Sequence, residues 1–170
     1  MRTGIAMGSN VGDRLETLVR ARDAVLALEG VSGPCLCSSL YETEPVGTEP
    51  DTWRFINAVI EVEYNGLPAS LLEGLQQIEA AMGRPSKRPR NAPRTIDLDI
   101  LYVGNLTLST TAIVIPHPRL HLRRFVLEPL VEIRPGLLLP GQQMTAGELL
   151  ETLADPFAVE LFHHQWPSLT

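Results

Sequence analysis

The chain has 170 residues, 44% of them hydrophobic and 20% charged, so one domain with one hydrophobic core is expected across residues 1–170. The 14 Lys and Arg against 20 Asp and Glu give a net charge of −6, which argues against nucleic acid or an anionic membrane as a partner. No run reaches the ~18 apolar residues of a membrane span and the N-terminus lacks a secretory signal, so a cytoplasmic protein is expected.

The N-terminal third predicts a strand, a helix and a second strand. Residues 3–7 predict a short strand, and Asp13 is placed to cap a helix whose apolar side chains recur at helical spacing through residue 28. Residues 35–46 predict an extended strand of mixed polarity. The helix is expected to break before it, at Gly30, Gly33 and Pro34.

The clearest strand covers residues 54–64, where the even positions are apolar from Ile56 to Tyr64. Its other side is expected to be wet at the far end and carries Asn57, Glu61 and Glu63. Pro68 suits the first turn of a helix that runs to Met82. Residues 95–103 then predict a strand with Asp97, Asp99, Leu101 and Val103 on one side, against Ile96, Leu98, Ile100 and Tyr102.

This order predicts an α+β, ferredoxin-like βαββαβ sandwich, in which two helices cover one sheet face and the other face is free for a ligand. Additional C-terminal strands and helices are expected: a strand ending at Ile115, a helix over 125–133 and a helix near 145–155. His163 and His164 are expected in an exposed tail.

Positive charge gathers in one segment. Residues 84–124 hold eight Lys and Arg against Asp97 and Asp99, a local charge of +6, whereas the remainder carries −12. A basic segment around two carboxylates is expected where a small polyanion is held through metal ions, and a solvated arginine-rich loop is the alternative. His117, Arg119, Arg123 and Arg124 form a second cationic group, for which a phosphate contact and a structural role both stay open.

Asp97 and Asp99 are candidate ligands for magnesium. Side chains two apart on a strand point the same way, about 7 Å apart at the backbone, so two carboxylates can converge on a pair of cations. Mg²⁺ prefers hard oxygen ligands and is usually completed by substrate phosphates. The alternative is a solvated sheet face, but Arg94 and the arginines before it favour a phosphate site.

Cys35 and Cys37 are the only cysteines. Two apart on a strand, they share a side but lie too far apart for relaxed disulfide geometry. Free thiols in a reducing compartment are expected.

Several segments together resemble the 6-hydroxymethyl-7,8-dihydropterin pyrophosphokinases of folate biosynthesis. They are IAMGSNVGDR at 5–14, SSLYETEPVG at 38–47, FINAV at 55–59, IEAAMGR at 78–84, PRTIDLDILYVG at 93–104 and IPHPRLHLRRFVLEPLVEI at 115–133. The resemblance implies an enzyme that transfers pyrophosphate from ATP to the pterin hydroxymethyl group and releases AMP. It also implies two Mg²⁺ ions, with ATP as co-substrate.

The resemblance implies a role for each matching residue. The metal ligands would be Asp97 and Asp99, which together with Arg84 and Arg94 form the catalytic set. The ATP-binding residues would be Glu79, Arg84, Arg94, His117 and Arg123. The pterin would lie between two phenylalanines, in a pocket formed by Thr43, Pro45, Val46, Gly47, Phe55, Asn57 and Phe125.

The chain departs from the family pattern at Ser86 and Asn91, where the family often carries an arginine and an aromatic residue, and residues 51–54 form a longer stretch than usual. Two alternative functions stay open: a ferredoxin-like single-stranded RNA-binding module, and another Mg-dependent kinase or nucleotidyltransferase. The expected partners are small-molecule substrates, with no nucleic acid and no membrane, for a monomer or weak homo-oligomer.

Overall fold

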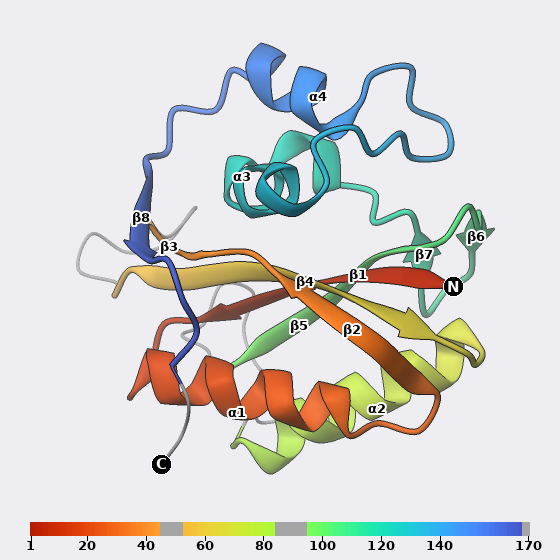
Figure 1. Ribbon diagram of the computed structural model, residues 1–170, viewed down its shortest axis with the longest axis vertical. Helices are drawn as coiled ribbons and strands as arrows, with labels where there is room; N and C mark the ends of the chain where they lie inside the picture. The colour runs from red at the N-terminus through yellow and green to blue at the C-terminus, as the bar shows by residue number, and fades with distance from the viewer. Residues whose placement is uncertain (45–52, 84–94, 168–170) are drawn as a thin grey trace.

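The computed structural model describes residues 1–44, 53–83 and 95–167 (Figure 1). The strands are β1 (Arg2–Ser9), β2 (Val31–Cys37), β3 (Leu40–Thr43), β4 (Phe55–Tyr64), β5 (Asp97–Val103), β6 (Leu108–Ser109), β7 (Val114–Ile115) and β8 (Val159–His163). The helices are α1 (Arg14–Leu26), α2 (Pro68–Ala81), α3 (Arg124–Ile133) and α4 (Ala146–Thr152), with a short 3-10 turn at Leu120–Leu122.

The molecule has three layers built on one antiparallel sheet. The strand order is β5-β1-β4-β3-β8, and β2 pairs with the part of β4 that β3 leaves uncovered. Helices α1 and α2 cover one face of the sheet, while α3 and α4 lie over the other (Figure 1). The expectation that this second face is free for a ligand is wrong for the part of it on which the C-terminal helices pack.

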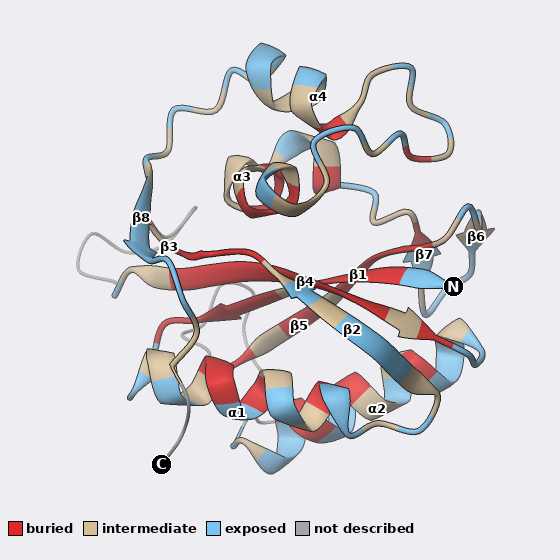
Figure 2. Ribbon diagram, viewed as in Figure 1, coloured by how far each residue is buried: buried red, intermediate tan, exposed pale blue. Residues whose placement is uncertain are grey.

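Two hydrophobic clusters lie on the two faces of the sheet (Figure 2). The larger cluster joins α1 and α2 to the sheet through side chains such as Ile5, Leu18 and Ile60. The smaller one joins α3 and α4 to it through Val59, Leu101 and Leu127. The predicted helix starts are confirmed, since Asp13 Oδ1 accepts the Glu16 N–H at 2.9 Å and Pro68 opens α2.

The strand predicted over 35–46 is two strands with a bend between them. β2 starts at Val31, so Gly33 and Pro34 lie inside it, where its pairing with β4 is irregular between Ser32 and Leu36. At the bend, the Ser38 Oγ accepts the Val59 N–H at 3.0 Å. A proline and a positive-φ glycine are tolerated because the irregular pairing replaces a regular ladder there.

A bulge in β5 moves Tyr102 to the face opposite the predicted one. Ile5 pairs with Ile100 but Gly4 pairs with Tyr102, so Leu101 is the extra residue. A bulge reverses the alternation beyond it, and Tyr102 joins Leu101 in the smaller cluster while Val103 joins the larger one. A Cβ on Gly4 would collide with the Tyr102 ring, so the glycine makes room for it.

Glu61 is buried rather than wet, with 4% of its surface exposed. Arg134, just after α3, donates to it through Nε at 2.9 Å and 3.1 Å, and the Tyr102 hydroxyl donates at 2.5 Å. Burial raises the Glu61 pKa, but these hydrogen bonds outweigh burial and lower it. The helix layer therefore supplies the partner that the isolated strand pattern could not indicate.

The C-terminal third is predicted in its helices but not in its last strand. α3 and α4 lie where helices are expected, and Thr145 and Glu148 form a capping box at α4. The strand expected to end at Ile115 is only the two-residue β7. β8 was not expected: it pairs with β3 and includes His163, so the exposed histidine is not in a tail.

Within the residues described, no helix is both long and apolar enough to cross a membrane.

Candidate active site

The strand register aligns predicted metal-binding and pterin-binding residues in one row across the sheet. Gly8 of β1 pairs with Asp97 of β5 on one side and with Asn57 of β4 on the other. The side chains of direct cross-strand partners point to the same face of a sheet. The Asp97 and Asn57 side chains therefore both point to the face on which α3 packs. With neighbouring strands ~4.8 Å apart, their backbones lie about 10 Å from each other.

Gly8 lies between these two residues and has no side chain of its own on this face. A Cβ at this position would lie 2.7 Å from Asn57 Oδ1 and 3.7 Å from Phe55 Cδ1. Ala6, the next residue of β1 on this face, adds only a methyl group. Between the predicted pterin-binding residues and the carboxylates, β1 therefore presents only the backbone of Gly8 and the methyl group of Ala6.

Asn57, at the end of this row that is predicted to bind the pterin, is held in a fixed orientation. Its Nδ2 donates to the Thr43 Oγ1 at 2.6 Å, and both side chains are buried. This contact directs Oδ1 over Gly8, where it is an acceptor for a ligand N–H. Phe55, directly opposite Thr43, is half-buried on the same face, and half-buried Phe125 of α3 packs into the smaller cluster on that face.

Asp97 and Asp99 are half-buried on β5, at the edge of the sheet. An edge strand leaves backbone N–H groups unpaired, and the buried Glu79 of α2 accepts the Leu98 N–H at 2.7 Å. Leu98 lies between the two aspartates, so this carboxylate fixes the backbone that carries both. Nothing in the sequence indicated this supporting contact of Glu79.

The charges that act on His117 are the positive charges of Arg123 and Arg119 and the opposing negative charge of Asp97. The His117 backbone N–H donates to the Leu101 carbonyl at 2.8 Å, and its Nδ1 accepts the Arg119 N–H at 3.2 Å. Burial, followed by the positive charges of Arg123 and Arg119, lowers the His117 pKa to about 4, against the opposing charge of Asp97. The imidazole is therefore neutral near pH 7, with its proton on Nε2 available to a ligand acceptor.

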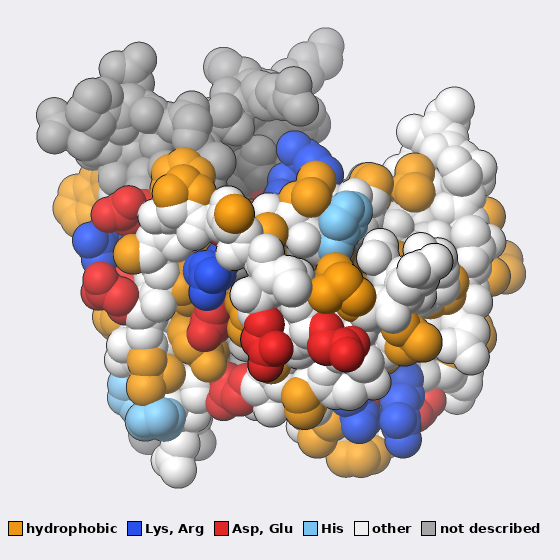
Figure 3. Space-filling view, turned by 90° about the horizontal axis from the view of Figure 1, so that it is seen from above, with side chains coloured by type: hydrophobic (Ala, Val, Ile, Leu, Met, Phe, Trp, Pro, Cys, Tyr) orange, Lys and Arg blue, Asp and Glu red, His pale blue; other side chains and the backbone are white. Residues whose placement is uncertain are grey.

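Arg123 precedes α3 and lies beside the second predicted phenylalanine. Its guanidinium carbon is 5.4 Å from the centroid of the Phe125 ring, within the range of a cation–π contact. Arg123, a predicted ATP-binding residue, and Phe125, a predicted pterin-binding residue, are thus neighbours. Figure 3, which looks onto the α3 and α4 layer, shows acidic and basic side chains mixed on the described part of this surface.

Asn10 and Arg14 were not predicted as site residues, although both lie in the GSNVGDR segment. Asn10 Nδ2 donates to the Trp53 carbonyl at 3.4 Å, and Arg14 Nη1 donates to the Arg54 carbonyl at 2.7 Å. These contacts fix the backbone that leads into Phe55. Five predicted site residues lie outside the described ranges: Pro45, Val46, Gly47, Arg84 and Arg94.

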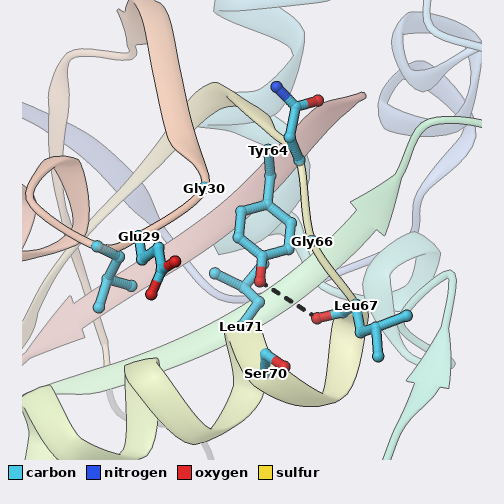
Figure 4. A pocket seen from close by; sticks show the side chains of 9 residues that line it. Glu29, Gly30, Tyr64, Gly66, Leu67, Ser70 and Leu71 are labelled. Carbon is cyan, nitrogen blue, oxygen red and sulfur yellow. Dashed lines mark hydrogen bonds between the residues drawn. The ribbon is translucent and has the colours of Figure 1, made fainter.

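One cavity of about 350 Å³ lies at the other end of β4, around Tyr64 (Figure 4). The Tyr64 hydroxyl donates to the Leu67 carbonyl at 3.3 Å across it. Tyr64 is nine residues from Phe55, about 30 Å along the strand. None of the predicted site residues lines this cavity.

Among the described residues, no three His, Cys, Asp or Glu come together as a metal-binding group.

The comparisons with known proteins agree on one family. Residues 4–135 match the family model described as 7,8-dihydro-6-hydroxymethylpterin-pyrophosphokinase (HPPK). The 2-amino-4-hydroxy-6-hydroxymethyldihydropteridine pyrophosphokinase of Bacillus subtilis is 45% identical over 76% of this chain and 75% of its own length. The Haemophilus influenzae protein of the same name is 38% identical over 92% of this chain and 96% of its own.

Solved structures show the same fold at lower identity. A crystal structure of HPPK-DHPS in complex with substrates superposes with a TM-score of 0.67 and 14% identity, over 89% of this chain. A Plasmodium falciparum HPPK-DHPS with pteroate gives 0.68 and 15%. This chain spans only 43% and 42% of the lengths of those two structures. By its sequence matches and its mixed fold with an antiparallel sheet, the chain belongs to the HPPK family.

Proposed function

We propose that this chain transfers pyrophosphate from ATP to the hydroxymethyl group of 6-hydroxymethyl-7,8-dihydropterin, giving AMP and the pterin diphosphate in folate biosynthesis. One observation carries the proposal: Asp97 and Asn57 flank Gly8 on the same sheet face. A pterin ring bound at Asn57 would extend its hydroxymethyl group across Gly8 toward the carboxylates. Family membership supports the same reaction.

Asp97 and Asp99 are the proposed ligands of two Mg²⁺ ions. Their carboxylates are the hard oxygen donors this ion prefers, and the small number of protein ligands leaves positions for ATP phosphates. When bound, the ions would neutralise phosphate charge and orient the β-phosphorus for in-line attack. The proposed part of Glu79 is to hold the Leu98 backbone, and with it the spacing of the two aspartates.

The proposed pterin site places an aromatic ring between Phe55 and Phe125. Asn57, oriented by Thr43, would read the polar edge of the pterin through Oδ1, while stacking on the phenylalanines excludes water. Pro45, Val46 and Gly47 are proposed to complete the pocket on the Thr43 side.

Cationic and neutral donors are proposed to hold ATP. The neutral His117 can donate from Nε2 to a phosphate or ribose oxygen, and Arg123 adds a positive charge beside it. Arg84 and Arg94 are proposed to stabilise charge on the transferred phosphates, and Glu79 is a further proposed nucleotide contact. Because the alcohol is a poor nucleophile, positioning and electrostatics contribute most of the rate.

We further propose that the segment from β1 to β5 is a ferredoxin-like βαββαβ unit within a single domain of residues 1–170. The strand order β5-β1-β4 with α1 and α2 on one face supports this arrangement. The proposed partners are the two small substrates, for a cytoplasmic monomer or weak homo-oligomer that binds no nucleic acid.

The decisive experiment incubates the protein with ATP, Mg²⁺ and the hydroxymethyl dihydropterin and separates the nucleotide products. AMP formed in equal amount to pterin diphosphate is expected, and Asp97→Asn serves as the matched inactive control. ADP would instead indicate a kinase and free pyrophosphate a nucleotidyltransferase. No turnover together with RNA binding would favour the binding module.

A further inference from the structure

The two cysteines form a site that the proposed reaction does not use. Cys35 and Cys37 are both half-buried free thiols on β2, and their Sγ atoms are 3.4 Å apart. Cys37 pairs with Ile60, whose side chain lies in the α1 and α2 cluster. The thiols therefore face away from the row of Asp97, Gly8 and Asn57, and they remain accessible to a small reagent from solution.

The positive charge of Arg22 acts on both thiols. Arg22 of α1 is held by the Asp23 carboxylate at 2.7 Å and stacks 5.1 Å from the Trp166 ring centroid. The hydrogen bond between the two thiols, together with the Arg22 charge, lowers the Cys37 pKa against the opposing effects of burial and the Asp23 charge. The same hydrogen bond and burial raise the Cys35 pKa.

The sulfur separation selects the kind of ligand. A disulfide needs about 2.05 Å between sulfurs, so the two thiols at 3.4 Å are not bonded to each other. An atom bonded to both sulfurs at about 2.3 Å would span 3.4 Å with an angle near 95° between its bonds. A linear two-coordinate ion with bonds of that length would need about 4.6 Å.

Among the residues that the structure describes, the two cysteines have no third protein ligand beside them. Zinc needs four ligands, and no third His, Cys, Asp or Glu joins the cysteines in the part of the chain described. The ligand must therefore use two sulfurs at nearly a right angle and bring its own third substituent. A pyramidal trivalent arsenic atom, with its lone pair, meets these requirements.

We propose that Cys35 and Cys37 are a dithiol site for monosubstituted trivalent arsenicals. In the reaction with phenylarsine oxide, each sulfur forms one bond to arsenic. The two thiol protons leave with the oxide oxygen as water, arsenic stays trivalent, and no oxidant or reductant is consumed.

Trp166 is a reporter placed beside this site. Its Nε1 donates to the carbonyl of Ser38, the residue after Cys37, at 2.8 Å, and its ring lies under Arg22. The only other tryptophan is the exposed Trp53. In a Trp53→Phe background, intrinsic fluorescence therefore reports on Trp166 alone.

The test titrates phenylarsine oxide into the full chain, with native mass spectrometry and Trp166 fluorescence as readouts. One phenylarsenic group per chain is expected, removable by dimercaptopropanol but not by an equal concentration of a monothiol. Cys35→Ser and Cys37→Ser are matched controls that each keep one thiol, and both should bind roughly 100-fold more weakly because the second bond is intramolecular.

Thermal unfolding establishes that each serine variant is folded before its affinity is compared. Equal affinity in either folded variant and the parent would overturn the dithiol site, as would failure of the parent to bind. Activity with ATP and the pterin is measured separately, so a failure of the proposed reaction leaves this result interpretable.

Discussion

Two acidic regions on the same face of the sheet have opposite surroundings. Glu61 on β4 is enclosed by Arg134 and Tyr102, whereas Asp97 and Asp99 on β5 remain half-buried. The difference comes from the helix layer, since Arg134 follows α3 and seals one half of the face. The helix layer thus makes Glu61 part of the protein core, whereas Asp97 and Asp99 stay at a half-buried sheet edge.

Removing the carboxylates of the half-buried region should give the largest effect. Asp97→Ala and Asp99→Ala are each expected to lower kcat by about 100-fold or more, because the charge on the ATP phosphates loses its metal bridge. Thermal unfolding should change little, since these carboxylates lie at a sheet edge. Steady-state kinetics and calorimetry check both parts, and near-normal turnover in the two variants would remove the metal assignment.

Removing the cation that encloses Glu61 should lower the stability of the fold instead of the rate of the reaction. Arg134→Ala leaves Glu61 buried without its cation and is expected to cost about 3 kcal/mol in the free energy of unfolding. Because the folded-state pKa of Glu61 is lowered, this stabilisation is present above the ordinary glutamate pKa and is lost as pH falls through the folded value. Urea unfolding at neutral and acidic pH should show the variant and parent converging in acid.

A double variant sharpens this interpretation. Replacing Glu61 and Arg134 together with methionine removes both charges and should cost less than Arg134→Ala alone. A double variant as unstable as the single one would show that packing, and not the unpaired charge, dominates.

A side chain added at Gly8 should affect substrate binding selectively. Gly8→Ala puts a Cβ 2.7 Å from Asn57 Oδ1, so the amide must move; a rise of roughly tenfold in the pterin KM is expected. The KM for ATP should change less. Gly136→Ala is the matched control, because its Cβ would meet no atom within 4 Å. Equal effects from the two substitutions would contradict a substrate position above Gly8.

The smallest expected effect concerns the protonation of His117. Its lowered pKa, to about 4, means that the imidazole stays neutral as pH falls from 8 to about 5.5. The unfolded chain takes up that proton near the ordinary histidine pKa, so the contribution of His117 to stability declines between about pH 6.5 and pH 4. An NMR titration of the ring protons checks this, and a midpoint near 6.5 in the folded protein would be the contrary result.

The sequence predicted local features well and long-range partners poorly. Asp13, Pro68 and the alternation in residues 54–64 depend on neighbours in the chain, and the structure agrees with them. Glu61 was misjudged because its partner Arg134 is 73 residues away. Tyr102 was assigned to the wrong face because a bulge depends on the pairing of two strands and leaves no mark in the alternation of one.

The family motifs indicated the residues of the candidate site, but they did not indicate the contacts that hold those residues in place. The family segments singled out Asn57, Asp97 and His117, and the register explains how the first two share a face. The contacts of Glu79 with Leu98 and of Arg14 with Arg54 depend on backbone groups of distant elements. Backbone acceptors and donors carry no residue identity, so a sequence pattern could not indicate them.

Gly4 and Gly8 give β1 two equivalent recesses on one face. The recess above Gly4 is filled by a phenol ring from the protein itself, and its hydroxyl is held by Glu61. The space above Gly8 is bordered by Asn57 Oδ1, and the hydroxymethyl group of the substrate is proposed to cross it. A glycine on the α3 side of β1 thus makes room for a side chain of the protein at one end of the strand, and is proposed to make room for a substrate at the other.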